Sequence, residues 1–350
     1  MKVVIIGGVA GGATAAARIR RLDEKAEIVV FERSGYISYA NCGLPYYIGG
    51  TIEDEGDLTL QTPESFYKRF RVKMNVRHEV TALHPESKMV TVKNIENGTV
   101  FTETYDKLIL SPGAKPIKPN FEGIDSDKIF TLRTVEDTLK IKKFINEKYP
   151  KSAVVVGGGF IGIEVAENLR ELGIDVTLVE AADQLMAPFD SDMASFIHAE
   201  LRKNGVNLML GRFVESFADT DDGICVKLKN SPTLHADMAA MAIGVAPETT
   251  LAKDAGLELG IKGSIVVNDR METSVTDIYA VGDAVQIRNF VTDTDALISL
   301  AGPANKQGRI AADNICGIDS HYRGGQGSSV IKLFDMTAAS TGINEKTAKA

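Results

Sequence analysis

The sequence predicts an α/β protein with two Rossmann-like dinucleotide-binding domains, followed by the start of a third, α+β domain. The main observation is that a strand, a glycine-rich turn, a helix and a second strand occur twice, near residues 1 and 153. Both copies end in an acidic residue, 20 and 18 residues after the last glycine of the turn. After Ser328 the pattern changes to two short strand-like segments, Val330–Phe334 and Ala338–Gly342, which indicate a new sheet.

The first copy begins with the apolar strand Lys2–Ile6 and continues through the turn Gly7–Gly12 into a helical stretch. A second strand, Glu27–Phe31, leads to Glu32. In such a unit the first glycine allows a tight turn and the second lets the backbone approach a pyrophosphate. The third lets helix and strand pack closely, and the acid binds ribose hydroxyls. Val9 stands where the second glycine usually stands, so the approach to the phosphate must follow a slightly different path.

The second copy is complete in Gly157, Gly159 and Gly162, and its closing acid is Glu180. This acid would face the 2′-phosphate of NADP as a like charge, at a cost of roughly 1–4 kcal/mol in a partly solvated site. The next three residues, Ala181–Asp183, include no arginine that could receive that phosphate. The sequence therefore favours NADH over NADPH.

A third glycine–acid pair, Gly282-Asp283, ends an apolar strand later in the chain. Its place after the two nucleotide units predicts that the carboxylate binds a sugar-like polyol and that the Gly282 backbone contacts the cofactor. Prolines at 116 and 119 mark a linker, and the turn Gly244–Pro247 returns the chain toward the first domain. We expect the first domain in residues 1–117 and 247–325, the second in 118–246, and the beginning of a truncated third domain in 326–350.

The composition excludes several classes of protein. The 350 residues are 44% apolar and 25% charged, with a net charge of −8, which argues against general binding to nucleic acid or anionic membranes. Three cysteines far apart in the sequence argue against a disulfide framework and fit a cytoplasmic protein. The five histidines show no metal-ligand spacing, and no run of 18 apolar residues suggests a membrane span. We therefore expect no metal site and no membrane segment.

Three motifs in this order resemble one family closely. They are Gly-Gly-Val-Ala-Gly-Gly at 7–12, Ser-Tyr-Ala-Asn-Cys-Gly-Leu-Pro-Tyr-Tyr at 38–47 and Leu-Ala-Gly-Pro-Ala-Asn at 300–305. The chain resembles flavoprotein (pyridine nucleotide) disulfide reductases over essentially its whole length. The match within that family is to coenzyme A–disulfide reductases and the related NADH-dependent persulfide reductases and NADH oxidases. The resemblance implies FAD on the first unit, NAD(P)H on the second, a C-terminal dimerisation domain and a homodimer. Some relatives also carry a rhodanese domain.

The resemblance, together with the two glycine motifs, also assigns residues to the two cofactors. In the first domain the expected cofactor contacts are Gly7, Val9, Ala10, Gly11, Gly12, Glu32, Arg33, Val80, Ser111, Pro112, Gly113, Gly282, Asp283 and Ala301. In the second domain they are Gly157, Gly159, Phe160, Ile161, Gly162, Glu164, Glu180 and Gly244.

Cys42 is the residue that best separates the functions open to such a chain. Asn41 is a good helix N-cap, which would place the sulfur in the first turn of a short helix that ends near Ile48. The free N–H groups and the positive helix end favour a thiolate, so we predict a thiol pKa below about 8.5. Cys225 and Cys316 lie far away in sequence, at apolar strand and helix positions.

A single cysteine leaves two chemistries open, because the common disulfide reductases of the family use a pair of nearby cysteines. Cys42 could cycle through a mixed disulfide with a substrate thiol, or through a sulfenic acid formed by peroxide. Peroxidase members carry a histidine in the first glycine loop, where this chain has Ala10, and usually read Leu-Ser-Cys rather than Ala-Asn-Cys. Both departures favour the mixed disulfide.

The expected reaction is therefore the reduction of coenzyme A disulfide or coenzyme A persulfide by NADH, through FAD and Cys42. An NADH oxidase or peroxidase is the first alternative, and a non-catalytic flavin-binding redox sensor is the second. Acid–base residues are expected in the dimerisation domain and stay unassigned.

Coenzyme A carries several phosphate charges and needs cations. Thr14, Arg18 and Arg21 recur at i, i+4 and i+7 of the first helix, so they share one face. Lys68–Lys73 is a second basic cluster, in which Phe70 stands where the family has a lysine, so Arg71 is the candidate replacement. The coenzyme A contacts that the resemblance implies are Thr14, Arg18, Arg21, Ser38, Asn41, Arg71 and Asn305.

Overall fold

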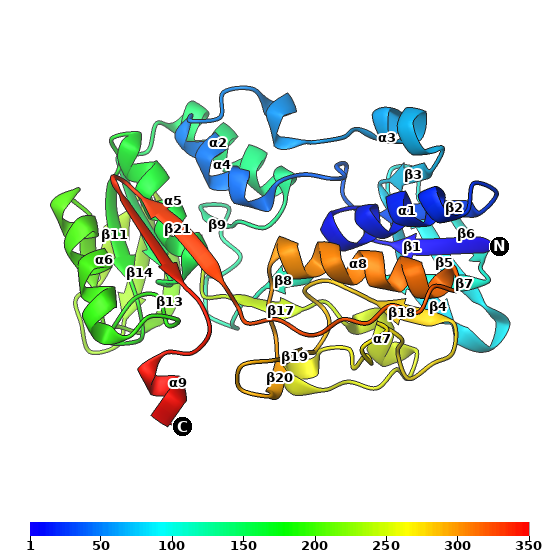
Figure 1. Ribbon diagram of the computed structural model, residues 1–350. Helices are drawn as coiled ribbons and strands as arrows, with labels where there is room; N and C mark the ends of the chain where they lie inside the picture. Colours follow the sequence, from blue (N-terminus) through cyan, green and yellow to red (C-terminus); the bar gives the residue numbers. More distant parts are fainter. Residues whose placement is uncertain (350) are drawn as a thin grey trace. The chain divides into compact units, whose positions relative to one another are not determined.

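The computed structural model describes residues 1–349 and divides into two compact units, each built from separate stretches of the chain (Figure 1). The first unit consists of Met1–Tyr39, Thr59–Lys115 and Ala246–Gly327. The second unit consists of Ala40–Leu58, Pro116–Val245 and the chain from Ser328 on. Cys42 therefore belongs to the second unit, whereas the first glycine loop belongs to the first.

A five-stranded parallel sheet forms the centre of the first unit. Its strands are near-continuous apolar runs because both faces are covered, as is usual for parallel sheets. Two helices, α1 (Ala10–Leu22) and α8 (Ala301–Ile315), pack against each other through small residues, and Gly308 faces the Gly11 carbonyl. The strand order is β18 (Ile278–Ala280), β7 (Lys107–Leu110), β1 (Lys2–Ile6), β2 (Glu27–Glu32) and β3 (Lys73–Val76).

The rest of the first unit consists of small antiparallel sheets and short helices. Helix α3 is polar, and Thr62 and Ser65 close its N-terminus with a capping box. The elements are α3 (Pro63–Phe70), β4 (His78–His84), η3 (Pro85–Ser87), β5 (Met89–Asn94), β6 (Val100–Thr104), α7 (Thr250–Asp254), η4 (Ile261–Gly263), β19 (Ile287–Asn289) and β20 (Thr294–Ala296).

The second unit repeats the same sheet order around β10 (Ser152–Val156), which corresponds to β1. Helix α5 (Phe160–Glu171) follows β10 as α1 follows β1. The parallel order is β12 (Asn207–Met209), β11 (Asp175–Val179), β10, β16 (Met238–Met241) and β9 (Ile129–Thr131). The other elements of this part are α4 (Val135–Lys148), α6 (Ser191–Lys203) and an antiparallel sheet of β13 (Val214–Thr220), β14 (Gly223–Leu228) and β15 (Leu234–Ala236).

Two further segments pack on the helices of the second unit. The segment around Cys42 forms the 3₁₀ turn η1 (Asn41–Gly43), helix α2 (Leu44–Gly49) and η2 (Glu55–Leu58), and α2 packs against α4 and α5. The hairpin β21 (Ser329–Leu333) and β22 (Met336–Ser340) packs against α5 and precedes α9 (Glu345–Lys349). The paired strands β8 (Ala114–Pro116) and β17 (Val245–Pro247) lie where the chain passes between units.

The predicted fold class is confirmed, since both parallel sheets carry the strand, glycine turn and helix in the expected order. The naming of domains by cofactor stays a prediction. Within residues 1–349, no helix is both long and apolar enough to cross a membrane. The same residues contain no group of three or more His, Cys, Asp or Glu side chains that could hold a metal ion.

Candidate functional site

The glycine loop between β1 and α1 is tightly packed. A Cβ atom on Gly12 would lie 1.9 Å from the Gly7 carbonyl oxygen, so the first and third glycines face each other in close contact. Gly7 also has a φ of +100°, and its Cβ would lie 2.1 Å from the carbonyl oxygen of Ser111. Val9 is the N-cap of α1 and keeps its side chain half exposed, so a valine is accommodated there.

The carboxylate of Glu32 is bound to this loop. One oxygen accepts the backbone N–H of Gly8 at 2.8 Å, and the other accepts that of Ser34 at 2.8 Å. The residue is 9% exposed, so its orientation is fixed beside the loop. Each carboxylate oxygen has a further lone pair, which is the acceptor that a ribose hydroxyl needs.

The second glycine loop has the same arrangement around Glu180. Its carboxylate accepts the N–H of Gly158 at 2.5 Å and that of Ala182 at 2.8 Å. Gly157 has a φ of +111°, and a Cβ on it would lie 2.3 Å from the Ala242 carbonyl oxygen. A Cβ on Gly159, in contrast, would meet nothing within 4 Å, so this glycine borders open space. That space lies where the pattern requires a pyrophosphate to approach the backbone.

Helices α1 and α5, which follow the two glycine loops, have similar N-termini, and both could bind an anion. Neither α1 nor α5 has a side-chain cap or an acidic residue in its first turn. The N-termini of α3 and α4 are instead closed by capping boxes with acids beside them. The first N–H groups of α1 and α5 are therefore left for a ligand, which fits the diphosphate of a dinucleotide.

The remaining first-domain candidates lie on both sides of this loop. Ser111 Oγ would lie 2.9 Å from a Cβ on Gly11 and 3.7 Å from one on Gly282, so these three residues come together. The Gly282 N–H donates to Gln307 Oε1 at 2.7 Å, which ties this turn to α8. Pro112, Gly113 and Asp283 follow in the same turns, and Ala301 begins α8.

The other two first-domain candidates are Val80 and Arg33. Val80 is 6% exposed and packs in the core, so only its backbone could face a cofactor. Arg33 is half exposed and lies 3.9 Å from the carboxylate of Glu248.

Cys42 is exposed in η1, and the predicted role of Asn41 as a helix N-cap is wrong. Asn41 lies inside the 3₁₀ turn, and Gly43 is the N-cap of α2. The Asn41 side-chain oxygen is buried and has no hydrogen-bond partner among residues 1–349. The prediction of a lowered thiol pKa is also wrong, because burial raises the pKa of Cys42 and the Glu164 carboxylate raises it further. The sulfur precedes the N-cap of a helix of only six residues, where the helix dipole gives little stabilisation of a thiolate.

A cluster of acids on α5 lies near Cys42. Burial, and secondarily Glu167, raise the pKa of Glu164 to about 7. Burial, Glu164 and Glu167 raise the pKa of Tyr46 to about 12, with smaller contributions from Cys42 and Glu171. Glu167 is 1% exposed and accepts the backbone N–H of Phe334 at 2.6 Å, which ties the hairpin β21–β22 to α5. Cys42 therefore lies near a carboxyl group that exchanges a proton near neutral pH.

Comparison with known proteins identifies the family. The family model described as pyridine nucleotide-disulphide oxidoreductase matches residues 1–308. The chain belongs to this family. A coenzyme A disulfide reductase of Staphylococcus aureus (strain JH9) is 38% identical over 349 residues, which cover 99% of this chain and 78% of that protein.

Two solved structures are very similar to this one. Reduced Bacillus anthracis CoADR-RHD has a TM-score of 0.97 and 50% identity, and the match covers 99% of this chain. An NAD-dependent persulfide reductase from A. fulgidus has a TM-score of 0.95 and 37% identity over 100% of this chain. The chain spans only 62% and 65% of these two solved chains. The predicted family and branch are confirmed.

Within this pyridine nucleotide-disulphide oxidoreductase, the expected coenzyme A residues fall into three groups. Thr14 Oγ1 donates to Asn305 Oδ1 at 2.8 Å, and Arg18 Nε donates to Asp313 at 2.7 Å, so these side chains lie between α1 and α8. Arg21 lies instead over the ring of Phe70, with 5.6 Å between its guanidinium carbon and the ring centroid.

The second group of coenzyme A candidates consists of Arg71, at the end of α3, and Ser38, which is bonded to the first glycine loop. Arg71 ends α3 with a φ of +54° and lies over the Tyr67 ring. Ser38 has a φ of +48°, and its N–H donates to the Gly8 carbonyl at 3.0 Å. Asn41, in the second unit, forms the third group alone.

The NAD candidates all lie in the second unit. Phe160, Ile161 and Gly162 form the first turn of α5, with a Cβ on Gly162 1.9 Å from the Gly157 carbonyl oxygen. Gly244 has a φ of +112° and precedes β17, and its carbonyl accepts the N–H of Ile117 at 3.0 Å.

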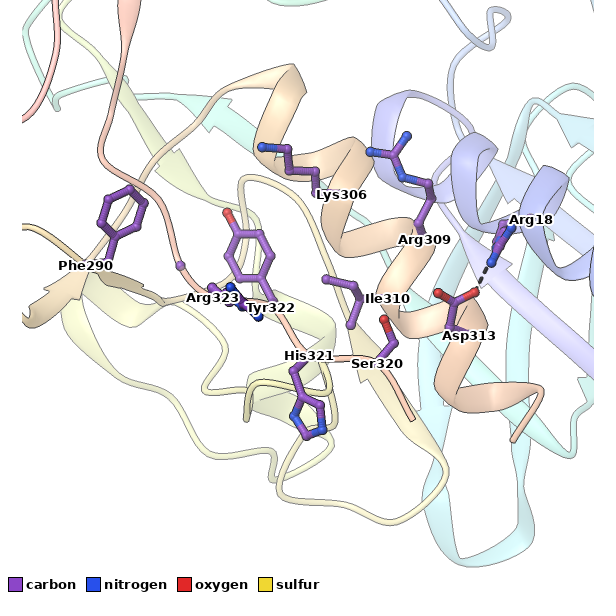
Figure 2. A pocket seen from close by; sticks show the side chains of 11 residues that line it. Arg18, Phe290, Lys306, Arg309, Ile310, Asp313, Ser320, His321, Tyr322 and Arg323 are labelled. Atoms are coloured by element: carbon purple, nitrogen blue, oxygen red, sulfur yellow. Dashed lines mark hydrogen bonds and ion pairs between the residues drawn. The ribbon is translucent and has the colours of Figure 1, made fainter. Parts of the chain in front are cut away.

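Sequence reasoning missed the cationic residues that follow Asn305. Lys306 and Arg309 lie on the exposed side of α8, and Arg323 follows that helix. The available signal was a pair of basic residues three positions apart, Lys306 and Arg309 (Figure 2), which is also typical of an ordinary solvated helix face.

Proposed function

We propose that this chain is an FAD-dependent NADH oxidoreductase that reduces coenzyme A disulfide or coenzyme A persulfide through a mixed disulfide on Cys42. The observation that carries the proposal is an exposed single cysteine beside a proton-holding carboxyl group, in a chain with two dinucleotide loops. The names of the coenzyme A disulfide reductase and the persulfide reductase among its relatives support the substrate class.

The two loops would hold the two cofactors by the same contacts. The N–H groups of α1 and Glu32 would bind the diphosphate and ribose of FAD, and those of α5 with Glu180 would bind NADH. When bound, FAD supplies a route for two electrons from NADH to sulfur. Domain names follow from this assignment. Residues 1–117 and 247–325 would bind FAD, residues 118–246 would bind NAD, and residues 326–350 would belong to the dimerisation domain.

Cys42 would attack one sulfur of the bound disulfide as a thiolate and release one coenzyme A thiolate. Two electrons then cleave the mixed disulfide, which releases the second thiolate and restores Cys42. The net change is one disulfide plus NADH and a proton, giving two thiols and NAD⁺. With a persulfide the products are one thiol and hydrogen sulfide.

Glu164 is the described group best suited to exchange the proton that this cycle requires. Its pKa of about 7 means that both protonation states are populated at neutral pH. The raised pKa of Cys42 means that its proton must leave before attack, and the Glu164 carboxylate acts on the same sulfur. A charged Glu164 disfavours the thiolate, so a protonated Glu164 would favour the nucleophilic state of Cys42.

The preference for NADH belongs to this proposal as well. Two backbone N–H groups hold the Glu180 carboxylate beside the second glycine loop, in which Gly159 borders open space. A 2′-phosphate would meet that negative charge. A cytoplasmic homodimer is the assembly we propose, by analogy with the family.

The test is turnover by the flavin-loaded protein with a panel of acceptors. We expect NADH consumption with coenzyme A disulfide or persulfide, and loss of that turnover in Cys42→Ser while the flavin stays bound. Faster consumption with air or hydrogen peroxide would favour the oxidase or peroxidase reading. No turnover with any of these acceptors would favour a redox sensor. An unchanged rate in Cys42→Ser would rule out the proposed mechanism.

A further inference from the structure

The loop 181–190, which follows Glu180, is folded back onto the second glycine loop. The Met186 N–H donates to the Gly158 carbonyl oxygen at 2.9 Å. The Leu185 side chain is fully buried and packs against Gly158, since a Cβ on that glycine would lie 2.2 Å from Leu185 Cδ2. Both polar groups of the Gly158 backbone are therefore bound, the N–H by Glu180 and the carbonyl by Met186.

The backbone of the 181–190 loop has a conformation that must be held from outside. Met186 has a φ of +53°, in the left-handed region, although it is a side chain with only 1% exposure. Within the loop, the Gln184 side-chain amide donates to the Phe189 carbonyl at 2.9 Å, and the Phe189 N–H donates to the Met186 carbonyl at 2.9 Å. A backbone of this kind persists only where the surrounding structure fixes it.

Helix α6 supplies one of the fixing contacts. The Leu185 N–H donates to Nε2 of His198, a half-buried residue of that helix, at 3.1 Å. A backbone N–H can only donate, so Nε2 must accept with its lone pair and the proton of the neutral ring is on Nδ1. A protonated imidazole carries N–H groups on both nitrogens and has no lone pair for Leu185. The contact therefore requires a neutral ring.

The surroundings of His198 favour that neutral ring. Burial lowers the pKa of His198, and the positive charge of Arg202, one turn further along α6, lowers it further. The ring is therefore an acceptor at neutral pH and gains a proton only in acid. Because the folded pKa is below that of the unfolded chain, the contact is complete above the ordinary histidine range and is lost as pH falls through the folded value.

The other elements that pack against α6 carry few charges toward this contact. Asp190, in the loop, accepts backbone N–H groups at the start of α9. Lys332, on β21, lies 3.5 Å from the buried carboxylate of Glu167. Asp183 is exposed in the loop, and β12 contains no titratable residue. Within residues 1–349, Arg202 is thus the charged neighbour that shifts the pKa of His198.

We propose that His198 is a positioning residue for NADH, which it does not touch. Its ring holds the Leu185 N–H, so that Met186 stays bound to Gly158 and the Gly158 N–H stays aimed at Glu180. Loss of the ring contact loosens the loop and with it the carboxylate and glycine turn on which ribose and diphosphate bind. The identity of the coenzyme rests on the proposed function, whereas the hold on the loop does not.

The first test measures NADH binding to the flavin-loaded protein at pH 8. His198→Leu keeps a similar volume but has no acceptor, and His198→Gln places an amide oxygen near the position of Nε2. We expect the Kd for NADH to rise about tenfold in the leucine variant and to stay within about twofold of the parent in the glutamine variant. The value of kcat at saturating NADH should change less than about twofold, because the contact acts on binding alone. Parental affinity in His198→Leu would overturn the proposal.

The matched control is a second histidine of the same unit. His235, on β15, lies 3.2 Å from the sulfur of Cys225 through its Nδ1 and has no contact with the loop. His235→Gln makes the same chemical change as His198→Gln, and it should keep the parental affinity for NADH at every pH.

The second test compares only the parent and His198→Gln, so it does not depend on the folding of the leucine variant. As pH falls from 8 to 5, the Kd of the parent should rise at least about threefold relative to that of His198→Gln, since the amide keeps its acceptor and the imidazole loses it. Titration of Glu164 is common to both proteins and cancels in this ratio. A ratio that stays constant across this pH range would contradict the role of the neutral ring.

The third test needs no coenzyme. Amide hydrogen exchange of the 181–190 loop should be at least about tenfold faster in His198→Leu than in the parent, and parental in His198→Gln. Equal exchange in the leucine variant and the parent would show that His198 does not hold the loop. A parent that binds no NADH would overturn the proposed function. A parent that binds NADH no better than His198→Leu would leave the proposed function standing and remove only the role of His198.

Discussion

Glu180 accepts the backbone N–H of Gly158 at 2.5 Å, so a carboxylate is fixed at the mouth of the second glycine loop. Glu32 accepts the N–H of Gly8 at 2.8 Å in the equivalent place of the first loop. The two units therefore share the glycine motif and also one hydrogen bond within it, from the N–H of the residue after its first glycine to the closing acid. This contact fixes the carboxylate beside the glycine loop in each unit.

The first prediction concerns coenzyme preference. Glu180→Gln removes the charge while keeping an oxygen that can accept an N–H, so kcat/KM for NADPH should rise about tenfold relative to NADH. Asp183→Ala removes a nearby exposed acid without this contact and should leave the ratio unchanged. Steady-state rates with both coenzymes check this, and an unchanged ratio in Glu180→Gln would mean that another residue selects the coenzyme.

The second prediction separates two glycines of one loop. Gly157→Ala places a Cβ 2.3 Å from the Ala242 carbonyl oxygen at a φ of +111°, so it should destabilise the protein by on the order of 2–4 kcal/mol. Gly159→Ala meets nothing within 4 Å and should leave the unfolding midpoint nearly unchanged.

The same pair of variants also tests the role of the open space. The methyl group added by Gly159→Ala would occupy the space through which the pyrophosphate approaches the backbone. NADH should therefore bind this variant several-fold more weakly than the parent. Thermal unfolding and NADH titration together check both statements. Unaltered NADH affinity in Gly159→Ala would show that the diphosphate does not approach this residue.

Much of the fold follows from local sequence, because the apolar strands, the glycines and the closing acids are contiguous. The predicted strand Lys2–Ile6 has those bounds in the structure, and the predicted strand Glu27–Phe31 is longer by one residue. Short strands such as β9 (Ile129–Thr131) and β15 (Leu234–Ala236) were not predicted. A three-residue strand shows no periodicity in the sequence and forms only by pairing within the folded sheet.

The environment of Cys42 could not be predicted because the residues that surround it are distant in sequence. Local pattern made Asn41 a cap and suggested a stabilised thiolate. In the folded chain, partial burial of the sulfur is the main cause of its raised pKa, and the packing of α2 on α5 brings Glu164 near it as the second cause.

The third prediction concerns the reactivity of Cys42. Glu164→Gln removes the nearby charge that raises the thiol pKa, so the thiolate fraction at pH 8 increases. Alkylation of Cys42, followed by mass spectrometry of its peptide, should become roughly two- to tenfold faster. Glu171→Gln, an exposed acid at the end of the same helix, should leave the rate unchanged. A slower or equal rate in Glu164→Gln would show that this carboxylate does not act on the sulfur.

The last prediction is the effect of Glu164 on stability as a function of pH. Burial, and secondarily Glu167, raise its pKa from the ordinary value of 4.5 to about 7, so between these values the folded protein binds more protons than the unfolded chain. Stability from this group is therefore fully present below pH 4.5 and is lost as pH rises toward 7. Glu164→Gln has no such loss, so its free energy of unfolding should exceed that of the parent at pH 8 by on the order of 2–3 kcal/mol, and the difference should shrink toward pH 5. Urea unfolding at both pH values checks this, with Glu171→Gln as the control that keeps the parental pH dependence. A difference that is the same at pH 5 and pH 8 would mean that the carboxyl group titrates normally.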